Sequence, residues 1–163
     1  MNREVSIQPL TAGAFAPFGD IISATGTPTM MINQGKCGRY HDLAQLDFGG
    51  GQAAISIFEG TPYDLPLDLV MMERHPLGSQ AFIPMSADPY LVIVAPDAGG
   101  DPGTPVAFRA HAGQGVNYHR NTWHGVLTPL GDTRHFSVID RVGEGNNLVE
   151  YWFDVPWRII ENA

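Results

Sequence analysis

Two histidines, His119 and His124, lie five positions apart in the stretch from Gly115 to Val126. Asn121, between them, favours turns, and the residues on either side favour strands. The pattern predicts a strand, a tight turn and a second strand. An imidazole titrates near neutral pH and binds divalent metals through either ring nitrogen, so this stretch suits proton transfer or metal binding.

A second polar cluster begins at Glu73, about forty residues earlier. Side chains alternate along a strand, so Glu73 and His75 share one face while Arg74 points to the other. A turn containing proline and glycine follows, and Gln80 then begins the next strand beside His75. Together with His124, these side chains offer four nitrogen and oxygen donors, a set suited to Mn, Fe, Ni or Zn.

The spacing alone leaves a simpler interpretation open. His75 could be a hydrogen-bonding residue before a proline turn, and Glu73 could pair at the surface with Arg74 or Arg109. A glutamate two positions before a histidine is an unspecific pattern.

Composition limits the classes of function. The chain has 163 residues and a formal net charge of -8, so nucleic-acid binding, which needs a basic face, has no electrostatic support. No window approaches the roughly 20 apolar residues of a membrane span, and the first four residues lack the apolar run of a signal peptide. Cys37 is the one cysteine, which excludes an internal disulfide. These features predict a cytoplasmic protein that binds neither nucleic acid nor membranes.

The elements that must position these side chains are short strands. Segments of alternating or apolar residues recur at a spacing of roughly 8–12 residues with little helical periodicity, which favours a β-sandwich or barrel in one domain, residues 1–163. Thr11 can cap one brief helix that carries Phe15 and Phe18. The predicted strands are 5–10, 53–58, 67–72, 80–84, 90–95, 106–109, 115–118, 123–127, 134–141 and 148–153. We expect strand 53–58 to be buried, 23–38 and 96–105 to be loops, and a tail to follow Pro156.

The two polar clusters resemble a variant of the cupin pattern. Its first motif is two histidines one residue apart, followed by a glutamate; its second is a proline-x-glycine turn followed by a histidine. In the first motif the corresponding residues here are Glu73, His75 and Gln80. In the second they are His119, Asn121 and His124. Asparagine visits the left-handed backbone region readily, so it can stand in for the glycine. The resemblance implies an all-β fold, a cupin-like barrel or jelly roll with few short helices.

The chain is also similar to the ureidoglycolate lyase family of allantoin breakdown, from about Val5 to about Arg141. The similarity lies in four blocks: Arg39 to Leu43, Glu73 to Pro84, Gly113 to His124, and Ile139 to Arg141. It implies cleavage of ureidoglycolate to glyoxylate and urea. Cupins also pair through sheet edges, which together with exposed apolar strands implies a homodimer.

The resemblance suggests a role for each candidate residue. A divalent metal (Ni, Mn or Zn) would be held by Glu73, His75, Gln80 and His124, although glutamine is a poor, neutral ligand. His119 is the predicted acid–base residue. Asp140 points inward on its strand and could orient a histidine, or it could simply pair with Arg141. Substrate contacts are predicted for Arg39, Arg120 and Tyr118. Arg120 could instead be a solvated turn residue, and Tyr118 part of the core.

Other functions stay open. The chain could be an amidohydrolase that releases ammonia from ureidoglycolate, a cupin module that only binds a small molecule, or a metal-dependent dioxygenase or isomerase. Two histidines and two carboxylates facing one cavity favour proton chemistry over simple binding. The missing first histidine argues against the histidine-rich iron site of an oxygenase.

Overall fold

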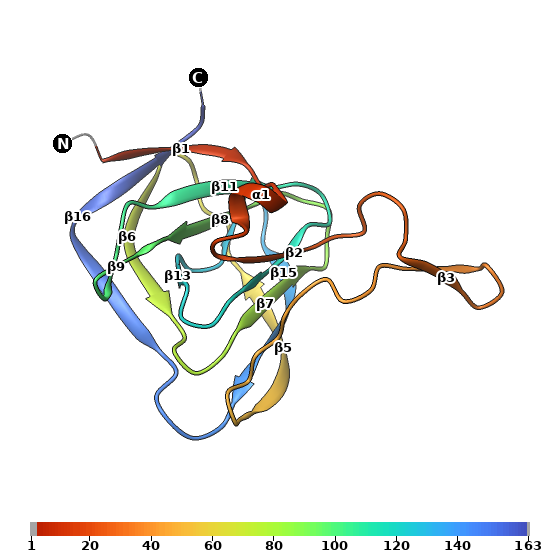
Figure 1. The fold of residues 1–163 in the computed structure, drawn as a ribbon. Coiled ribbons are helices and arrows are strands. Elements are labelled where there is room, and N and C mark those ends of the chain that lie inside the picture. Colours follow the sequence, from red (N-terminus) through yellow and green to blue (C-terminus); the bar gives the residue numbers. More distant parts are fainter. Residues whose placement is uncertain (1–2, 163) are drawn as a thin grey trace.

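A computed structural model describes residues 3–162 and consists almost entirely of strands (Figure 1). Residues 1–2 and 163, the ends of the predicted domain, lie outside the described residues. The short helix α1 (Ala12–Phe15) is capped by Thr11, as predicted. Within the described chain, no helix is long and apolar enough to cross a membrane.

Six strands close into a small barrel. In order around the ring they are β11 (Val106–Ala110), β1 (Glu4–Pro9), β16 (Val149–Ile160), β6 (Leu67–Arg74), β13 (Trp123–His124) and β8 (Tyr90–Ala95). β11 pairs with β8 as well as with β1, which closes the ring. The short strand β14 (Thr128–Pro129) also pairs with β8.

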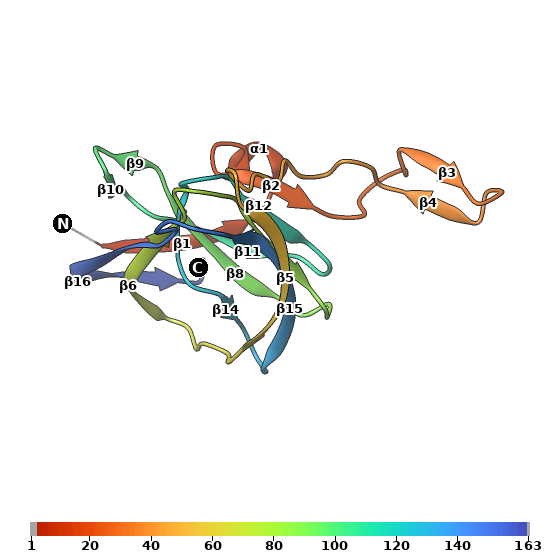
Figure 2. The same ribbon diagram turned by 90° about the horizontal axis from the view of Figure 1, so that it is seen from below.

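A second sheet of five strands packs against this ring (Figure 2). Its order is β2 (Gly19–Ile22), β12 (Gly115–Tyr118), β7 (Gln80–Pro84), β15 (Arg134–Val142) and β5 (Gln52–Gly60). All of its pairings are antiparallel. The expectation of an all-β, cupin-like barrel with few helices is therefore confirmed.

The apolar side chains form two clusters. One joins α1 and the five-stranded sheet to β8 and β11, with Phe15, Phe82, Phe108 and Phe136 in it. The other includes residues of β1, β6, β8, β11, β13 and β16, the strands of the ring. Every residue of β8 is buried because its alternate side chains belong to the two clusters in turn. This packing holds β6, β7 and β13 in place, and these are the strands that carry or adjoin the polar residues.

Some predicted elements were wrong in detail. Strand β5 is not buried: it is the last strand of its sheet, and Ile55 and Ile57 face outward. The predicted loop 23–38 contains a hairpin of β3 (Met30–Ile32) and β4 (Cys37–Arg39), which projects from the body in Figure 1 and Figure 2. The loop 96–105 likewise contains a small pair, β9 (Asp97–Ala98) and β10 (Asp101–Pro102).

Two strand boundaries also differ from the prediction. The segment predicted as strand 123–127 pairs only at its start, as β13, before β14 begins. The predicted tail after Pro156 is instead the second half of β16. The register of β16 against β6 shifts between Trp152 and Trp157, so the proline, which has no N–H to donate, lies where ladder pairing is interrupted.

Candidate active site

The two polar clusters meet between the barrel and the second sheet. His124 of β13 stands directly opposite Glu73 of β6 in the antiparallel register, so their side chains share a face. His75 follows the end of β6, and Gln80 opens β7. The backbone N–H of Asn121 donates to the carbonyl of His75 at 2.9 Å, which ties the two motifs together. Asn121 has φ +66°, the left-handed conformation expected of it in place of a glycine.

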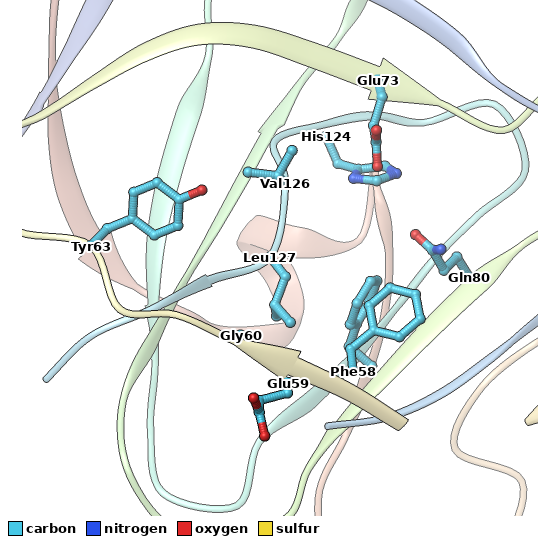
Figure 3. Close-up of a pocket in the computed structure, with 10 residues that line it drawn as sticks. Phe58, Glu59, Gly60, Tyr63, Glu73, Gln80, His124, Val126 and Leu127 are labelled. Atoms are coloured by element: carbon cyan, nitrogen blue, oxygen red, sulfur yellow. The ribbon is translucent and has the colours of Figure 1, made fainter. Parts of the chain in front are cut away.

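Glu73, Gln80 and His124 line one end of an open cavity of about 450 Å³ (Figure 3). Strand β5 and the segments that follow β5 and β13 supply most of its other walls. The lining residues are Phe58, Glu59, Gly60, Tyr63, Glu73, Gln80, Phe82, His124, Val126 and Leu127. The cavity is thus polar at one end and largely apolar elsewhere, as small-molecule sites usually are.

His124 presents a free lone pair to this cavity. Its Nδ1 lies 2.9 Å from the carbonyl oxygen of Gly125, which can only accept, so Nδ1 carries the hydrogen. The other nitrogen, Nε2, is buried without a hydrogen-bond partner among residues 3–162. The ring is 1% exposed and stacks on Tyr118, with centroids 4.3 Å apart and planes 2° from parallel. Burial and the neighbouring His75 lower the pKa of His124 to about 3, so Nε2 stays unprotonated.

His75 faces acceptor oxygens on both sides. Its Nδ1 donates to the carbonyl of Asn147 at 2.7 Å, and its Nε2 lies 3.1 Å from Gln80 Oε1 and 3.9 Å from Glu73 Oε1. Burial raises the pKa of Glu73 above its ordinary value; His75 partly opposes this, and Glu150 adds to it. Ligand atoms of Glu73, His75 and His124 all lie within 4.8 Å of one another.

Several acceptor atoms therefore converge where few hydrogens are available. A cation among them would satisfy the orphaned Nε2 of His124, the Glu73 carboxylate and the Gln80 oxygen together. Two imidazoles and a carboxylate are ligands that Zn, Ni and Mn accept. The residues present fit a divalent metal.

Asp140 supports this cluster through another residue. It accepts from the Gln80 amide Nε2 at 3.2 Å, and the same amide presents its oxygen to His75. The Asp140 carboxylate therefore orients His75 only through the Gln80 amide. Arg141, the alternative partner for Asp140, instead donates to the backbone carbonyls of Phe48 and Glu144.

His119 and Arg120 lie outside the lining of this cavity. They border a separate hollow with Gln45, Leu46 and Asp47. His119 Nε2 donates to Asp20 Oδ2 at 2.9 Å, and Arg120 forms a two-pronged ion pair with Asp47. Both side chains are therefore already paired with a carboxylate of the protein.

The other two predicted substrate contacts also stand apart from the lining. Arg39 ends β4 in the projecting hairpin and is exposed. Tyr118 is buried and stacks on His124. Its observed role is to hold the imidazole, in line with the alternative that placed it in the core.

Sequence reasoning missed the residues that come from irregular segments. Tyr63 lies between β5 and β6, Val126 and Leu127 lie between β13 and β14, and Asn147 comes just before β16. Tyr63 and Asn147 lie outside every predicted strand, and Val126 and Leu127 were predicted to continue a strand that ends at His124, so no spacing singled them out. Phe58 could have been predicted as a lining residue. Side chains alternate along β5, so Phe58 points to the face opposite that of the exposed Ile57.

Comparison with known proteins identifies the family of the chain. A model of the ureidoglycolate lyase family matches residues 2–160. The chain is 57% identical over 159 residues to a protein of Chelativorans sp. (strain BNC1) named ureidoglycolate lyase, with 96% of each chain covered. It is 54% identical to ureidoglycolate lyase 2 of Rhizobium meliloti (strain 1021), over 94% of this chain and 95% of that one. It is 55% identical to a ureidoglycolate lyase of Rhodobacter capsulatus, over 94% of this chain and 96% of that one. The chain belongs to the ureidoglycolate lyase family.

Proposed function

We propose that this protein is a carbon–nitrogen lyase that cleaves ureidoglycolate to glyoxylate and urea in the breakdown of allantoin. The observation that carries the proposal is the convergence of Glu73 and His124, with His75 beside them, at one end of a cavity whose other walls are mostly apolar. The relatives named ureidoglycolate lyase support the same substrate.

The reaction needs one proton to move. The hydroxyl of the substrate loses its proton, its oxygen becomes the glyoxylate carbonyl, the C–N bond breaks, and the nitrogen of the departing urea gains a proton. Glu73 suits both transfers, because a carboxylate has two oxygens: one can hold the metal while the other takes the proton from the hydroxyl. The proton taken from the hydroxyl is then returned to the leaving nitrogen, so the step balances.

A divalent metal is part of the proposal. Glu73, His75 and His124 would hold it, with Gln80 beside them as a neutral oxygen donor. When bound, such an ion would neutralise the substrate carboxylate and lower the pKa of its hydroxyl. Charge supports a metal here: among the described residues, those that line the cavity include the Glu73 carboxylate and no lysine or arginine, although the substrate is an anion. Asp140 would position Gln80.

Product analysis tests the reaction. Purified protein incubated with ureidoglycolate should release glyoxylate and urea in equal amounts. Ammonia and carbon dioxide in place of urea would make it an amidohydrolase, and binding without turnover would make it a binding module.

A substitution tests the site. His124→Ala should lower kcat/KM by more than about 100-fold, since even the loss of a residue that only contacts a metal ligand lowers metal affinity or activity about 10- to 100-fold. His111→Ala, an exposed histidine outside the cavity lining, is the matched control and should keep full activity.

We also propose that the protein acts as a homodimer in the cytoplasm. Exposed isoleucines on the edge strand β5 support pairing of two copies, and the lone cysteine supports a reducing compartment. The predicted acid–base role of His119 and the predicted contacts of Arg39 and Arg120 with substrate stay predictions.

A further inference from the structure

The polar groups at the metal-binding end of the cavity offer mainly acceptors. His124 Nε2 offers a lone pair, and Glu73 offers carboxyl oxygens. The amide nitrogen of Gln80 already donates to Asp140, which leaves only its oxygen, an acceptor, facing His75. A substrate hydroxyl or a cation can meet these atoms. A carbonyl oxygen, which needs a donor, finds little to meet here.

Tyr63 supplies a donor at the opposite side of the cavity. Its backbone is fixed, because its N–H donates to the carbonyl of Pro129 at 2.9 Å and it forms a bridge with Leu130. Figure 3 shows the phenol entering from the segment after β5, with its hydroxyl directed toward Val126 and the side of the cavity where His124 lies. In the described part of the chain the hydroxyl has no hydrogen-bond partner, and the residue is 37% exposed.

Glu59, the other polar residue on this side, does not compete for the ligand. Its side chain points away from the cavity in Figure 3 and pairs with His135 at 2.9 Å on the outer face of the sheet. The walls between Tyr63 and the metal-binding end are apolar, with Phe58, Val126 and Leu127. The cavity therefore has one polar end rich in acceptors and one isolated donor facing it.

This arrangement orients a substrate that has a charged and a neutral end. The carboxylate and hydroxyl belong at the end where a cation can be held, which leaves the neutral ureido group facing the phenol. We propose that Tyr63 is a substrate-binding residue that donates a hydrogen bond to the ureido carbonyl oxygen and so fixes which end of the substrate enters first. The inference rests on the proposed function, because it takes ureidoglycolate as the substrate.

Direct binding of two fragments tests it. N-carbamoylglycine carries the ureido and carboxylate groups, whereas glycolate carries the hydroxyl and carboxylate only. Titration calorimetry on the metal-loaded protein measures both without turnover. Tyr63→Phe removes only the hydroxyl, and it should raise the Kd of N-carbamoylglycine about 3- to 10-fold, the worth of one hydrogen bond, while the Kd of glycolate changes less than about 2-fold.

The matched control is Tyr40→Phe, whose hydroxyl bonds to Gly26 in the projecting segment away from the cavity lining; it should change neither Kd. An unchanged Kd for N-carbamoylglycine in Tyr63→Phe would overturn the inference. An equal rise for glycolate would also overturn it, because the phenol would then meet the carboxylate. If the wild-type protein bound neither fragment, the proposed function itself would fail, and the two failures are thus distinguishable.

Discussion

The Nε2 atom of His124 is buried and has no hydrogen-bond partner among the described residues. An unsatisfied polar atom away from water costs about 1–3 kcal/mol, and here the Tyr118 stack and the bond to Gly125 prevent the ring from turning to find water. A bound ligand would satisfy this atom. Because Glu73 and His75 lie within reach, a cation is the partner that fits all three.

Metal binding by this cluster can be measured without an assay of turnover. We expect protein purified without chelator to bind one divalent ion per chain, measured by elemental analysis and by titration with Ni, Mn or Zn. Asp140→Asn removes the charge that holds the Gln80 amide, so it should weaken binding about 10- to 100-fold. Asp154→Asn, an exposed carboxylate on β16, should leave the affinity unchanged. Equal affinity in the two variants would contradict the role given to Asp140.

The residues that were predicted correctly to come together share one property. Glu73, His75, Gln80 and His124 lie in or next to regular strands, where alternation and short turns fix which side chains share a face. Tyr63 could not be found in this way, because it enters from an irregular segment whose path depends on contacts with Pro129 and Leu130.

At the scale of elements, residues 43–48 form a segment without regular structure that polar groups hold against the five-stranded sheet. Asp20 Oδ2 accepts from the Gln45 N–H at 2.9 Å, from Asn117 at 3.0 Å and from His119 at 2.9 Å. Burial alone would raise the pKa of Asp20, but these bonds more than offset it and lower the pKa below the ordinary value of 3.8.

Removing this carboxylate should therefore loosen the segment. Asp20→Ala takes away the acceptor of the Gln45 N–H and one of the two acceptors of the buried Asn117 amide, so we expect a loss of about 2–4 kcal/mol in the free energy of unfolding at pH 7. A depressed pKa gives stability that is complete above the ordinary pKa and is lost as pH falls through the folded value. The difference from wild type should thus shrink below about pH 4. Guanidinium unfolding across pH measures it, and faster hydrogen exchange at Gln45 should accompany it; a gap that does not change with pH would contradict this account.

The same cluster offers a direct test for His119. Because this imidazole bonds to Asp20 and lies outside the lining of the main cavity, we expect His119→Gln to lower stability by about 0.5–1.5 kcal/mol and kcat by less than 10-fold. A general acid or base contributes about 10²- to 10⁴-fold. A loss of that size with unchanged stability would restore the catalytic role predicted from the sequence. The cupin pattern located this residue correctly in the turn, but position along the chain does not reveal which way a turn residue points.

The strands β5 and β16 show which features of an element position along the chain does not reveal. Apolar residues in β5 predicted burial, and the strand itself was found, but burial depends on what covers each face. The same run of hydrophobic residues occurs in central strands and in edge strands that another chain covers, so the sequence does not distinguish the two. The second half of β16 was missed because proline normally ends a strand, whereas here pairing with β6 on both sides of the register shift, and with β1 after it, continues the strand past the proline.

At the scale of the whole molecule, β5 has an unusual surface. Ile55 is 76% exposed and Ile57 56% exposed on the same outer face, and among the described strands β5 pairs only with β15, so its other edge is free. Adjacent exposed isoleucines on a free edge invite association. Phe58 on the same strand lines the cavity, so contact between two copies at β5 would also steady the wall of each site.

If two copies pair through β5, both the mass of the protein in solution and its activity should depend on Ile55 and Ile57. Wild-type protein should sediment at twice the 17.7 kDa of the chain. The double variant Ile55→Lys and Ile57→Lys should sediment as a monomer, since it removes about 1.5–3 kcal/mol of burial per isoleucine and sets like charges against each other. Both side chains are exposed in the single chain, so the variant should still fold with an unchanged circular dichroism spectrum. Val155→Lys is the matched control on β16, 57% exposed, and should stay dimeric. Dissociation by Val155→Lys instead would move the interface to the barrel, whereas a monomeric double variant with lowered kcat would tie the β5 contact to the cavity wall that Phe58 provides.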